Sequence, residues 1–333
     1  MLSPTLTATL SQLGFFKMTA FSNVTVAGAG TMGHAIALVH AIGGCQVTLT
    51  DLSTAQLEWA GTRIDSLIHE IETLGLIKAS DTKAILRRIE YQADIGRALE
   101  HADLLVEAIV EDAEVKKAFY QQVAPLMPKT CVLASNTSFL DVFPLLPSIL
   151  KERSLIVHWY TPPYLIDLVD VVPAPDTPFR IAREMKQFLE RMGKKPVILK
   201  KFVPGYIANN VQMAIESEVF RLLDAGVASV ADIDDAVRYG LAQRLSVMGQ
   251  FKKIDYTGLQ VVHDIHVAGL YTPPSQPTAT QRLKELLSEG ASGVLSGHGF
   301  YNYSDADSAT YLTRRDRKLV KIKQAMRDDD DQI

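Results

Sequence analysis

The sequence has few cysteines and no long apolar run. Only Cys45 and Cys131 occur in 333 residues, and both lie in apolar stretches typical of strands or strand edges. We therefore expect two buried thiols and no disulfide, as in a reducing compartment, with the cytoplasm as the default location. No run of about 18 uninterrupted apolar residues is present, so the sequence predicts no membrane span.

An excess of basic residues is also missing. The formal net charge is −4, with 34 Lys and Arg against 38 Asp and Glu, so we expect no nucleic-acid partner. A 47% hydrophobic content with 22% charged residues is ordinary for a globular enzyme, and the length suggests two domains. His263 and His266 flank Asp264, but no third ligand is obvious, so we expect no metal.

The most informative segment is a short apolar strand, 24–27, that runs into a glycine-rich turn and then into an apolar helix. Gly28 permits the tight turn, Gly30 lets backbone N–H groups approach a pyrophosphate, and Gly33 lets the helix pack close to the strand. The helix N-terminus adds a partial positive charge for the phosphates. The sequence therefore predicts a dinucleotide site built from Gly28, Ala29, Gly30, Thr31, Met32 and Gly33.

A second strand, 46–50, ends on a carboxylate, Asp51, 18 positions after the last glycine of the turn. This spacing predicts that Asp51 accepts hydrogen bonds from the adenosine ribose hydroxyls. No Lys or Arg follows Asp51 before Arg63, so no cation is placed to receive a 2′-phosphate. The predicted cofactor is therefore NAD in preference to NADP.

Strands and helices alternate up to about residue 200, which is typical of a parallel, doubly wound α/β sheet. Further strands are expected at 89–92, 104–108, 131–135, 155–159 and 196–199. A long helical insertion, 54–88, separates the second and third strands and is expected to break near Gly75 and 79–81.

A second, helical domain is expected after Pro204-Gly205, with helices at 208–224, 229–239, 258–266 and 280–288. The tail from Asp305 has the mixed charges of a solvated helix. The predicted parts are an N-terminal extension (1–20), a Rossmann-type NAD-binding domain (21–202), an all-α domain (203–304) and a charged tail (305–333).

Polar residues follow two of the expected strands at the edge where doubly wound folds bind ligands. Glu111 follows the fourth strand, where it could serve the cofactor or only carry charge at the start of the next helix. The fifth strand ends in Ser135-Asn136-Thr137-Ser138. These residues could cap the next helix, but their position favours a place beside the nicotinamide and substrate.

The candidate base is His158, in an apolar strand that precedes a Thr161-Pro162-Pro163 turn. A second extended run, 165–172, follows the turn and can pair antiparallel with the first, which would bring Asp170 back beside His158. A carboxylate that fixes the tautomer of the imidazole and stabilises its charged form makes it a competent base.

Several of these segments together resemble the 3-hydroxyacyl-CoA dehydrogenase family, over about residues 21–303. The sequence is similar to a divergent member of the 3-hydroxybutyryl-CoA dehydrogenase type. The matching segments are the glycine turn, 106–111, 135–138, His158, 204–209, 232–234 and 297–303.

The resemblance implies a homodimer in which a Rossmann-type domain is joined to a helical dimerisation domain. It implies NAD-dependent oxidation of the 3-hydroxyl of an acyl-CoA, as in fatty acid metabolism. By the same resemblance, His158 is the base and Asp170 its orienting acid. Ser138 and Asn209 would hydrogen-bond the reacting oxygens, and Glu111 and Lys116 would lie on the nicotinamide ribose side.

The sequence departs from the family pattern near the substrate. The acid is usually Glu, whereas here it is Asp170, and Thr161 replaces the Asn of the His-x-x-Asn-Pro pattern. The insertion has no Lys or Arg over 64–77, where the family helps to grip CoA, whose phosphates require cations. Two alternatives therefore stay open. One is a dehydrogenase of a hydroxy acid or ring-borne alcohol or aldehyde without CoA, and the other is a non-catalytic, crystallin-like dinucleotide-binding protein.

Overall fold

The computed structural model describes residues 21–274 and 279–328 of the chain. It divides into two compact units, Met1–Tyr206 and Ile207–Ile333, each of which is described by itself. The predicted extension over 1–20 and the last residues of the predicted tail, 329–333, lie outside the described residues.

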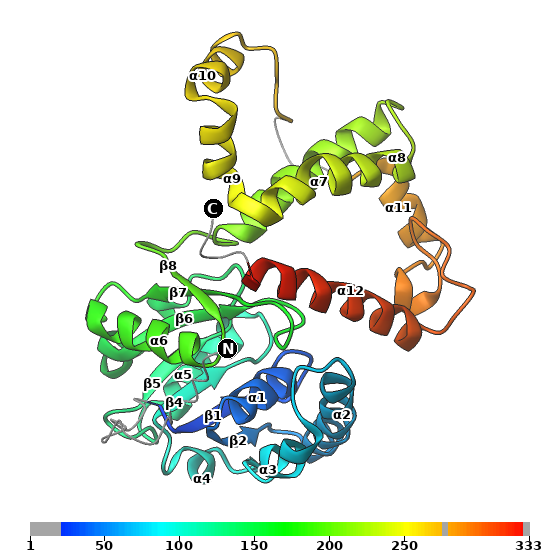
Figure 1. Ribbon diagram of the computed structural model, residues 1–333. Helices are drawn as coiled ribbons and strands as arrows, with labels where there is room; N and C mark the ends of the chain where they lie inside the picture. Colours follow the sequence, from blue (N-terminus) through cyan, green and yellow to red (C-terminus); the bar gives the residue numbers. More distant parts are fainter. Residues whose placement is uncertain (1–20, 275–278, 329–333) are drawn as a thin grey trace, which may run out of the picture. The chain divides into compact units, whose positions relative to one another are not determined.

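The first unit is built on one sheet of eight strands (Figure 1). The strands are β1 (Asn23–Ala27), β2 (Gln46–Thr50), β3 (Ile89–Tyr91), β4 (Leu104–Glu107), β5 (Val132–Ser135), β6 (Ser154–Trp159), β7 (Leu168–Pro173) and β8 (Lys195–Ile198). Their order is β3-β2-β1-β4-β5-β6-β7-β8, and every neighbouring pair is parallel except β6 and β7. The first six strands have the order of dinucleotide-binding folds, so the Rossmann-type prediction is confirmed.

Helices cover both faces of this sheet because its strands are apolar on both sides. On one face, α1 (Gly33–Ile42), α2 (Thr54–Thr73) and α6 (Phe179–Arg191) pack on residues such as Val26 and Val157. On the other face, α4 (Ile95–Leu99), α5 (Ala113–Val123) and two 3-10 helices, η2 (Phe143–Leu145) and η3 (Ser148–Arg153), pack on Leu105 and Ile156. The carboxyl ends of β1, β2, β4, β5 and β6 consequently meet at one edge of the sheet.

The insertion between β2 and β3 forms two helices, as predicted. The first, α2, begins where the Ser53 side chain accepts a hydrogen bond from the Gln56 N–H at 3.2 Å. It is followed by Gly75, whose φ of +73° is the left-handed conformation that terminates helices. A 3-10 turn, η1 (Ala79–Asp81), then leads into α3 (Thr82–Leu86).

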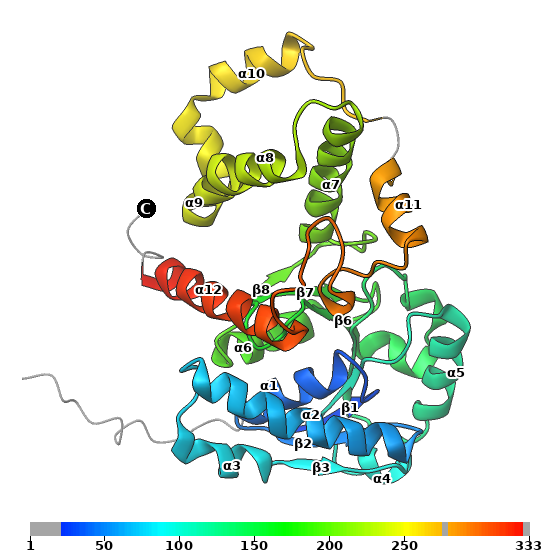
Figure 2. The same ribbon diagram turned by 90° about the vertical axis from the view of Figure 1, so that its right-hand side faces the viewer.

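The second unit is helical: α7 (Ala208–Asp224), α8 (Val230–Asp235), the π-helix η4 (Ala236–Ala242), α9 (Gln243–Thr257), α10 (Leu259–Val267), α11 (Gln281–Ser288), the 3-10 helix η5 (Val294–Ser296) and α12 (Ser308–Asp328). The sequence prediction ended a helix at 239 and missed α9, which continues from η4 and leads into α10 (Figure 2). Gly249 kinks α9 with a φ of +68° and does not end it. Among the described residues, no helix is long and apolar enough to cross a membrane.

Both cysteines are buried free thiols, as predicted. Cys45 and Cys131 directly precede β2 and β5, at the edge of the sheet opposite the carboxyl ends of those strands. Burial raises the pKa of Cys45 to about 11 and that of Cys131 to about 12, so both stay protonated at neutral pH.

Candidate active site

The glycine turn between β1 and α1 is shaped by packing at two of its glycines. Gly28 has a φ of +98°, and a Cβ there would lie 2.5 Å from the carbonyl oxygen of Ala108. A Cβ on Gly33 would lie 1.7 Å from the carbonyl oxygen of Gly28. A Cβ on Gly30 would meet no atom within 4 Å, and no side chain caps the N-terminus of α1. The turn thus leaves open space in front of the helix, where a pyrophosphate can approach the backbone.

A cavity of about 880 Å³ lies beside this turn. Its volume is in the range of small-molecule and cofactor sites. Its lining residues include Gly28, Gly30, Thr31, Asp51 and Trp59. The remaining lining is mainly apolar and includes Leu52, Ala93, Ile95, Ile109, Val110, Val115 and Phe119. Backbone donors, a carboxylate and an apolar wall fit the pyrophosphate, ribose and adenine of NAD.

Asp51 connects the two loops that border this cavity. One carboxylate oxygen accepts a hydrogen bond from the Ala29 N–H at 2.8 Å, and the other accepts from the Ser53 N–H at 3.0 Å. The amide of Gln56 donates to the carbonyl oxygen of Ala29 at 3.0 Å, which strengthens the same connection. The carboxylate is therefore fixed at the end of β2, where the sequence predicts the ribose contact.

We expect Asp51→Ala to raise the KM for NAD+ by about tenfold or more, because hydrogen bonds to a charged group contribute about 1.5–3 kcal/mol each. The kcat should stay within about twofold, since Asp51 lies at the adenosine end of the predicted site. Steady-state kinetics with varied NAD+ measures both constants. Asp65→Ala, on the exposed surface of α2, is the matched control. An unchanged KM in Asp51→Ala would show that the ribose contact is misplaced.

The antiparallel pairing of β6 and β7 sets His158 directly opposite Asp170. The His158 Nδ1 is 3.3 Å from the Asp170 Oδ2, and both side chains are buried. On the other side of the ring, Nε2 is 3.2 Å from the Oγ of Ser138, in the turn after β5. The predicted juxtaposition of His158 and Asp170 is thus present. It lies at the end of β6, at the same edge of the sheet as the glycine turn.

Glu111 holds the turn that carries Ser138. Its Oε1 accepts hydrogen bonds from the Thr137 hydroxyl at 2.7 Å and from the N–H groups of Ser138 and Phe139 at 2.8 and 3.0 Å. Burial alone would raise the pKa of Glu111, but these donors and the Lys116 ammonium outweigh it and hold the pKa below its usual value. Asp112, not Glu111, caps α5, by accepting from the Val115 N–H at 2.9 Å. Glu111 therefore supports the Ser138 turn and is not merely charge at a helix start.

Glu107, which is not among the predicted site residues, is fully buried at the end of β4. Its carboxylate accepts hydrogen bonds from the Lys116 ammonium, the Tyr120 hydroxyl and the Ser135 hydroxyl. The same ammonium lies 3.4 Å from the Glu111 carboxylate. An acid inside an otherwise apolar strand is the signal that could have revealed this network. The Lys116 ammonium is buried between these two carboxylates. Its contact with the nicotinamide ribose stays a prediction.

The other predicted residues have distinct positions. Met32 accepts a hydrogen bond from the Thr161 hydroxyl at 3.2 Å, so the position where the family has Asn contacts the glycine turn. Asn209 lies in the first turn of α7, in the second unit, and its role stays a prediction.

Burial lowers the pKa of His40 to about 4, which keeps this ring neutral behind β6. Among the described residues, no group of three or more His, Cys, Asp or Glu could hold a metal.

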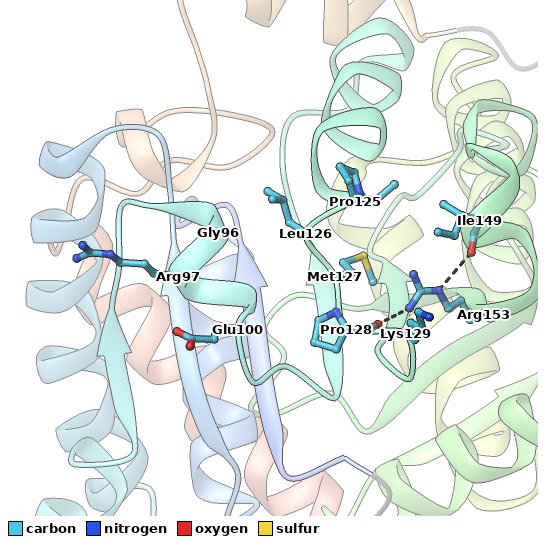
Figure 3. Close-up of a pocket in the computed structure, with 11 residues that line it drawn as sticks. Gly96, Arg97, Glu100, Pro125, Leu126, Met127, Pro128, Lys129, Ile149 and Arg153 are labelled. Atoms are coloured by element: carbon cyan, nitrogen blue, oxygen red, sulfur yellow. Dashed lines mark hydrogen bonds between the residues drawn. The ribbon is translucent and has the colours of Figure 1, made fainter.

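A second cavity, of about 640 Å³, lies near the amino-terminal ends of β5 and β6 (Figure 3). Arg153 closes one side and donates to the carbonyl oxygens of Ile149 and Pro128. Arg97, Glu100 and Lys129 also line it. This cavity is at the edge of the sheet opposite the pair of His158 and Asp170, and it does not belong to the candidate active site.

Comparison with known proteins supports the same interpretation. The family models "3-hydroxyacyl-CoA dehydrogenase, NAD binding domain" and "3-hydroxyacyl-CoA dehydrogenase, C-terminal domain" match residues 23–202 and 205–303. The chain is 27% identical over 305 residues to a 5-formyl-3-hydroxy-2-methylpyridine 4-carboxylate 5-dehydrogenase of Mesorhizobium japonicum, covering 91% of this chain and 98% of the relative. It is 31% identical over 297 residues to the mitochondrial hydroxyacyl-coenzyme A dehydrogenase of Sus scrofa, covering 86% and 93%.

A crystal structure of a 5-formyl-3-hydroxy-2-methylpyridine 4-carboxylic acid 5-dehydrogenase, described as an NAD+-dependent dismutase, is similar with a TM-score of 0.81 and 26% identity. The similarity covers 92% of this chain and 98% of that one.

Proposed function

Because the chain belongs to the 3-hydroxyacyl-CoA dehydrogenase family, we propose that it catalyses NAD-dependent oxidation of a hydroxyl group with His158 as the general base. The observation that carries this proposal is the imidazole of His158, which bridges Ser138 and Asp170 at the edge of the sheet that holds the glycine turn.

The buried carboxylate of Asp170 favours a proton on Nδ1 of His158, which leaves Nε2 as an acceptor. The Ser138 hydroxyl lies 3.2 Å from Nε2. It is placed to hydrogen-bond the substrate oxygen while the proton of the substrate hydroxyl moves to Nε2. Bound NAD+ supplies the acceptor for the hydride that leaves the substrate carbon. Loss of this hydride and of the hydroxyl proton converts an alcohol into a carbonyl. Asp170 then stabilises the positive charge on the imidazole, and Asn209 is the proposed second donor to the substrate oxygen.

For the substrate, we propose a small carboxylated alcohol or hydrated aldehyde without a CoA group. Residues 64–77, which run from α2 into the segment after it, expose Asp65, His69 and Glu70 and contain no Lys or Arg. The phosphates of CoA require cations, which this surface does not provide. The similarity to a pyridine carboxylate dehydrogenase over 98% of its length favours the same substrate class. A 3-hydroxyacyl-CoA is the second candidate, favoured by the 31% identity to a hydroxyacyl-coenzyme A dehydrogenase.

The substrate proposal is tested by following NADH absorbance with a panel of compounds. The panel contains 3-hydroxybutyryl-CoA, free 3-hydroxybutyrate, gulonate, carnitine and 5-formyl-3-hydroxy-2-methylpyridine 4-carboxylate, with His158→Ala as the control. Turnover of a free acid without turnover of the CoA ester is the expected result. Turnover of the CoA ester alone would assign the second candidate. Tight NADH binding with no turnover of any compound would favour the non-catalytic, crystallin-like alternative.

We also propose that the second unit forms a homodimer. The helices α7, α8, α9 and α10, which lie wholly within the described residues, contain no buried side chain. Large apolar residues are exposed on α9 and α10, including Phe251 at 84%, Leu259 at 66% and Ile265 at 57%. Exposed apolar area costs about 25 cal/mol per Å², so such helices require a covering surface. A second copy of this chain provides it, as expected from the resemblance to a dimeric family.

Two aspartates on α10, Val261→Asp with Ile265→Asp, should convert the dimer into a monomer, because they place charge in the apolar contact. These residues are 51% and 57% exposed and one helical turn apart. Light scattering coupled to size exclusion measures the mass. The control is Thr62→Asp with Ser66→Asp, at exposed positions of α2 with the same spacing. A wild-type monomer, or an α10 variant that stays dimeric, would contradict this proposal.

A further inference from the structure

Tyr160 follows β6 directly and contacts both members of the His158–Asp170 pair. Its hydroxyl donates a hydrogen bond of 2.6 Å to the Oδ2 of Asp170. Its ring lies edge-on to the imidazole of His158, with centroids 4.6 Å apart and planes at 72°. Tyr160 therefore limits the movement of the base and its acid at the same time.

The hydrogen bonds of Asp170 are unequal. Its Oδ2 accepts from Tyr160 at 2.6 Å and lies 3.3 Å from the Nδ1 of His158. A bond of an imidazole N–H to a carboxylate is usually shorter than 3.0 Å, so the contact with Tyr160 is the stronger one. The second oxygen, Oδ1, is buried and accepts no hydrogen bond from the residues that the structure describes. The position of this carboxylate thus depends mainly on the Tyr160 hydroxyl.

We propose that Tyr160 is a positioning residue of the active site, whose hydroxyl fixes the Asp170 carboxylate and weakens its hold on the His158 proton. Part of the negative charge on Oδ2 is then directed at the phenol proton instead of at the imidazole. Removal of this hydroxyl should therefore strengthen the hold of the Asp170 carboxylate on the His158 proton. The inference rests on the proposed role of His158 in the reaction.

The other titratable groups around the imidazole have separate hydrogen-bond partners. The Tyr206 ring lies 4.8 Å from the His158 ring, and its hydroxyl donates to the carbonyl oxygen of Thr137 at 2.5 Å. Burial raises the pKa of Tyr206, so it stays a neutral phenol. The Glu111 carboxylate accepts from the Ser138 N–H and acts on His158 only across that turn. These hydrogen bonds of Tyr206 and Glu111 do not involve the Tyr160 hydroxyl.

The first test is Tyr160→Phe, with Tyr91→Phe on β3 as the matched control. Loss of the hydroxyl leaves the full carboxylate charge on the imidazole, so a higher pH is needed to free the base. We expect the acid limb of the kcat profile to move up by about 0.5 pH unit or more, with a several-fold lower plateau. The KM for NAD+ should not change. An acid limb that stays in place would overturn the proposal, since a merely structural role lowers the plateau without moving the limb.

A second test uses the space that the hydroxyl fills. Asp170→Glu adds one methylene toward Tyr160 and should lower kcat about tenfold, because the longer carboxylate collides with the phenol oxygen. In the double variant with Tyr160→Phe, that oxygen is absent and the longer side chain fits, so most of the activity should return. Full activity of Asp170→Glu alone, or independent effects in the double variant, would contradict the proposal.

A readout that needs no substrate separates this inference from the proposed function. The NMR signals of the His158 ring, assigned by comparison with His158→Ala, are followed against pH in the wild type and in Tyr160→Phe. The midpoint should be higher in the variant even if no compound of the panel turns over. If His158→Ala retains turnover, the proposed function fails. If only the shift in Tyr160→Phe is absent, the inference about Tyr160 fails and the proposed function stands.

Discussion

His158→Ala should lower kcat by about 10³-fold, because general base catalysis by a positioned side chain contributes about 10²–10⁴-fold. In the first unit, Nε2 of His158 is the basic atom that faces Ser138 at the carboxyl edge of the sheet. The Asp170 carboxylate is buried behind the ring and cannot replace it. The affinity for NADH should stay within about twofold, since the cavity beside the glycine turn does not include His158. Steady-state kinetics and NADH fluorescence measure the two effects.

The control for this experiment is His69→Ala, at an exposed position of α2, which should leave kcat unchanged. His158→Gln tests the same point with a side chain that hydrogen-bonds but cannot accept a proton at neutral pH. Its kcat should be as low as that of the alanine variant. More than about a tenth of the wild-type kcat in either variant would exclude His158 as the general base.

Lys116→Met should lower the free energy of unfolding by about 3–5 kcal/mol, because it leaves a buried carboxylate without its counter-ion. The Lys116 ammonium is 1% exposed and Glu107 is fully buried. Methionine fills a similar volume, so the lost charge is the main change. The two tryptophans, Trp59 and Trp159, both lie in the first unit. Urea denaturation followed by tryptophan fluorescence therefore reports the stability of this unit.

Lys117→Met is the matched control, because Lys117 is the exposed neighbour of Lys116 on α5. It should change the free energy of unfolding by no more than about 0.5 kcal/mol. Adding Glu107→Gln to Lys116→Met should restore part of the loss, since a neutral amide is easier to bury than a carboxylate. If Lys116→Met and Lys117→Met are equally stable, the buried ion pair does not contribute to the fold.

Most of the first unit was predictable from local sequence patterns. The alternation of apolar strands with helices predicts β1, β2, β4, β5 and β6 to within one residue at each end. The proline turn between two extended runs predicts an antiparallel pair that brings Asp170 back beside His158, and the structure has these two residues opposite each other. The sequence prediction ended a helix at 239, whereas in the structure the helical chain continues through α9 with only a kink at Gly249. A glycine permits a change in backbone conformation, but it does not determine whether a helix continues beyond it.

The amino-acid sequence by itself determined the glycine turn, the position of Asp51 at the end of β2 and the pairing of His158 with Asp170. Each of these depends on residues in adjacent elements, whose geometry is set by the chain between them. The tertiary structure alone decided which side chains support that pair. The Lys116 ammonium reaches Glu107 and Glu111 because α5 packs on the sheet at the end of β4. The Tyr160 hydroxyl reaches Asp170 because its ring packs edge-on against the His158 imidazole. Such contacts depend on side-chain directions within the packed fold, and residue spacing does not specify them.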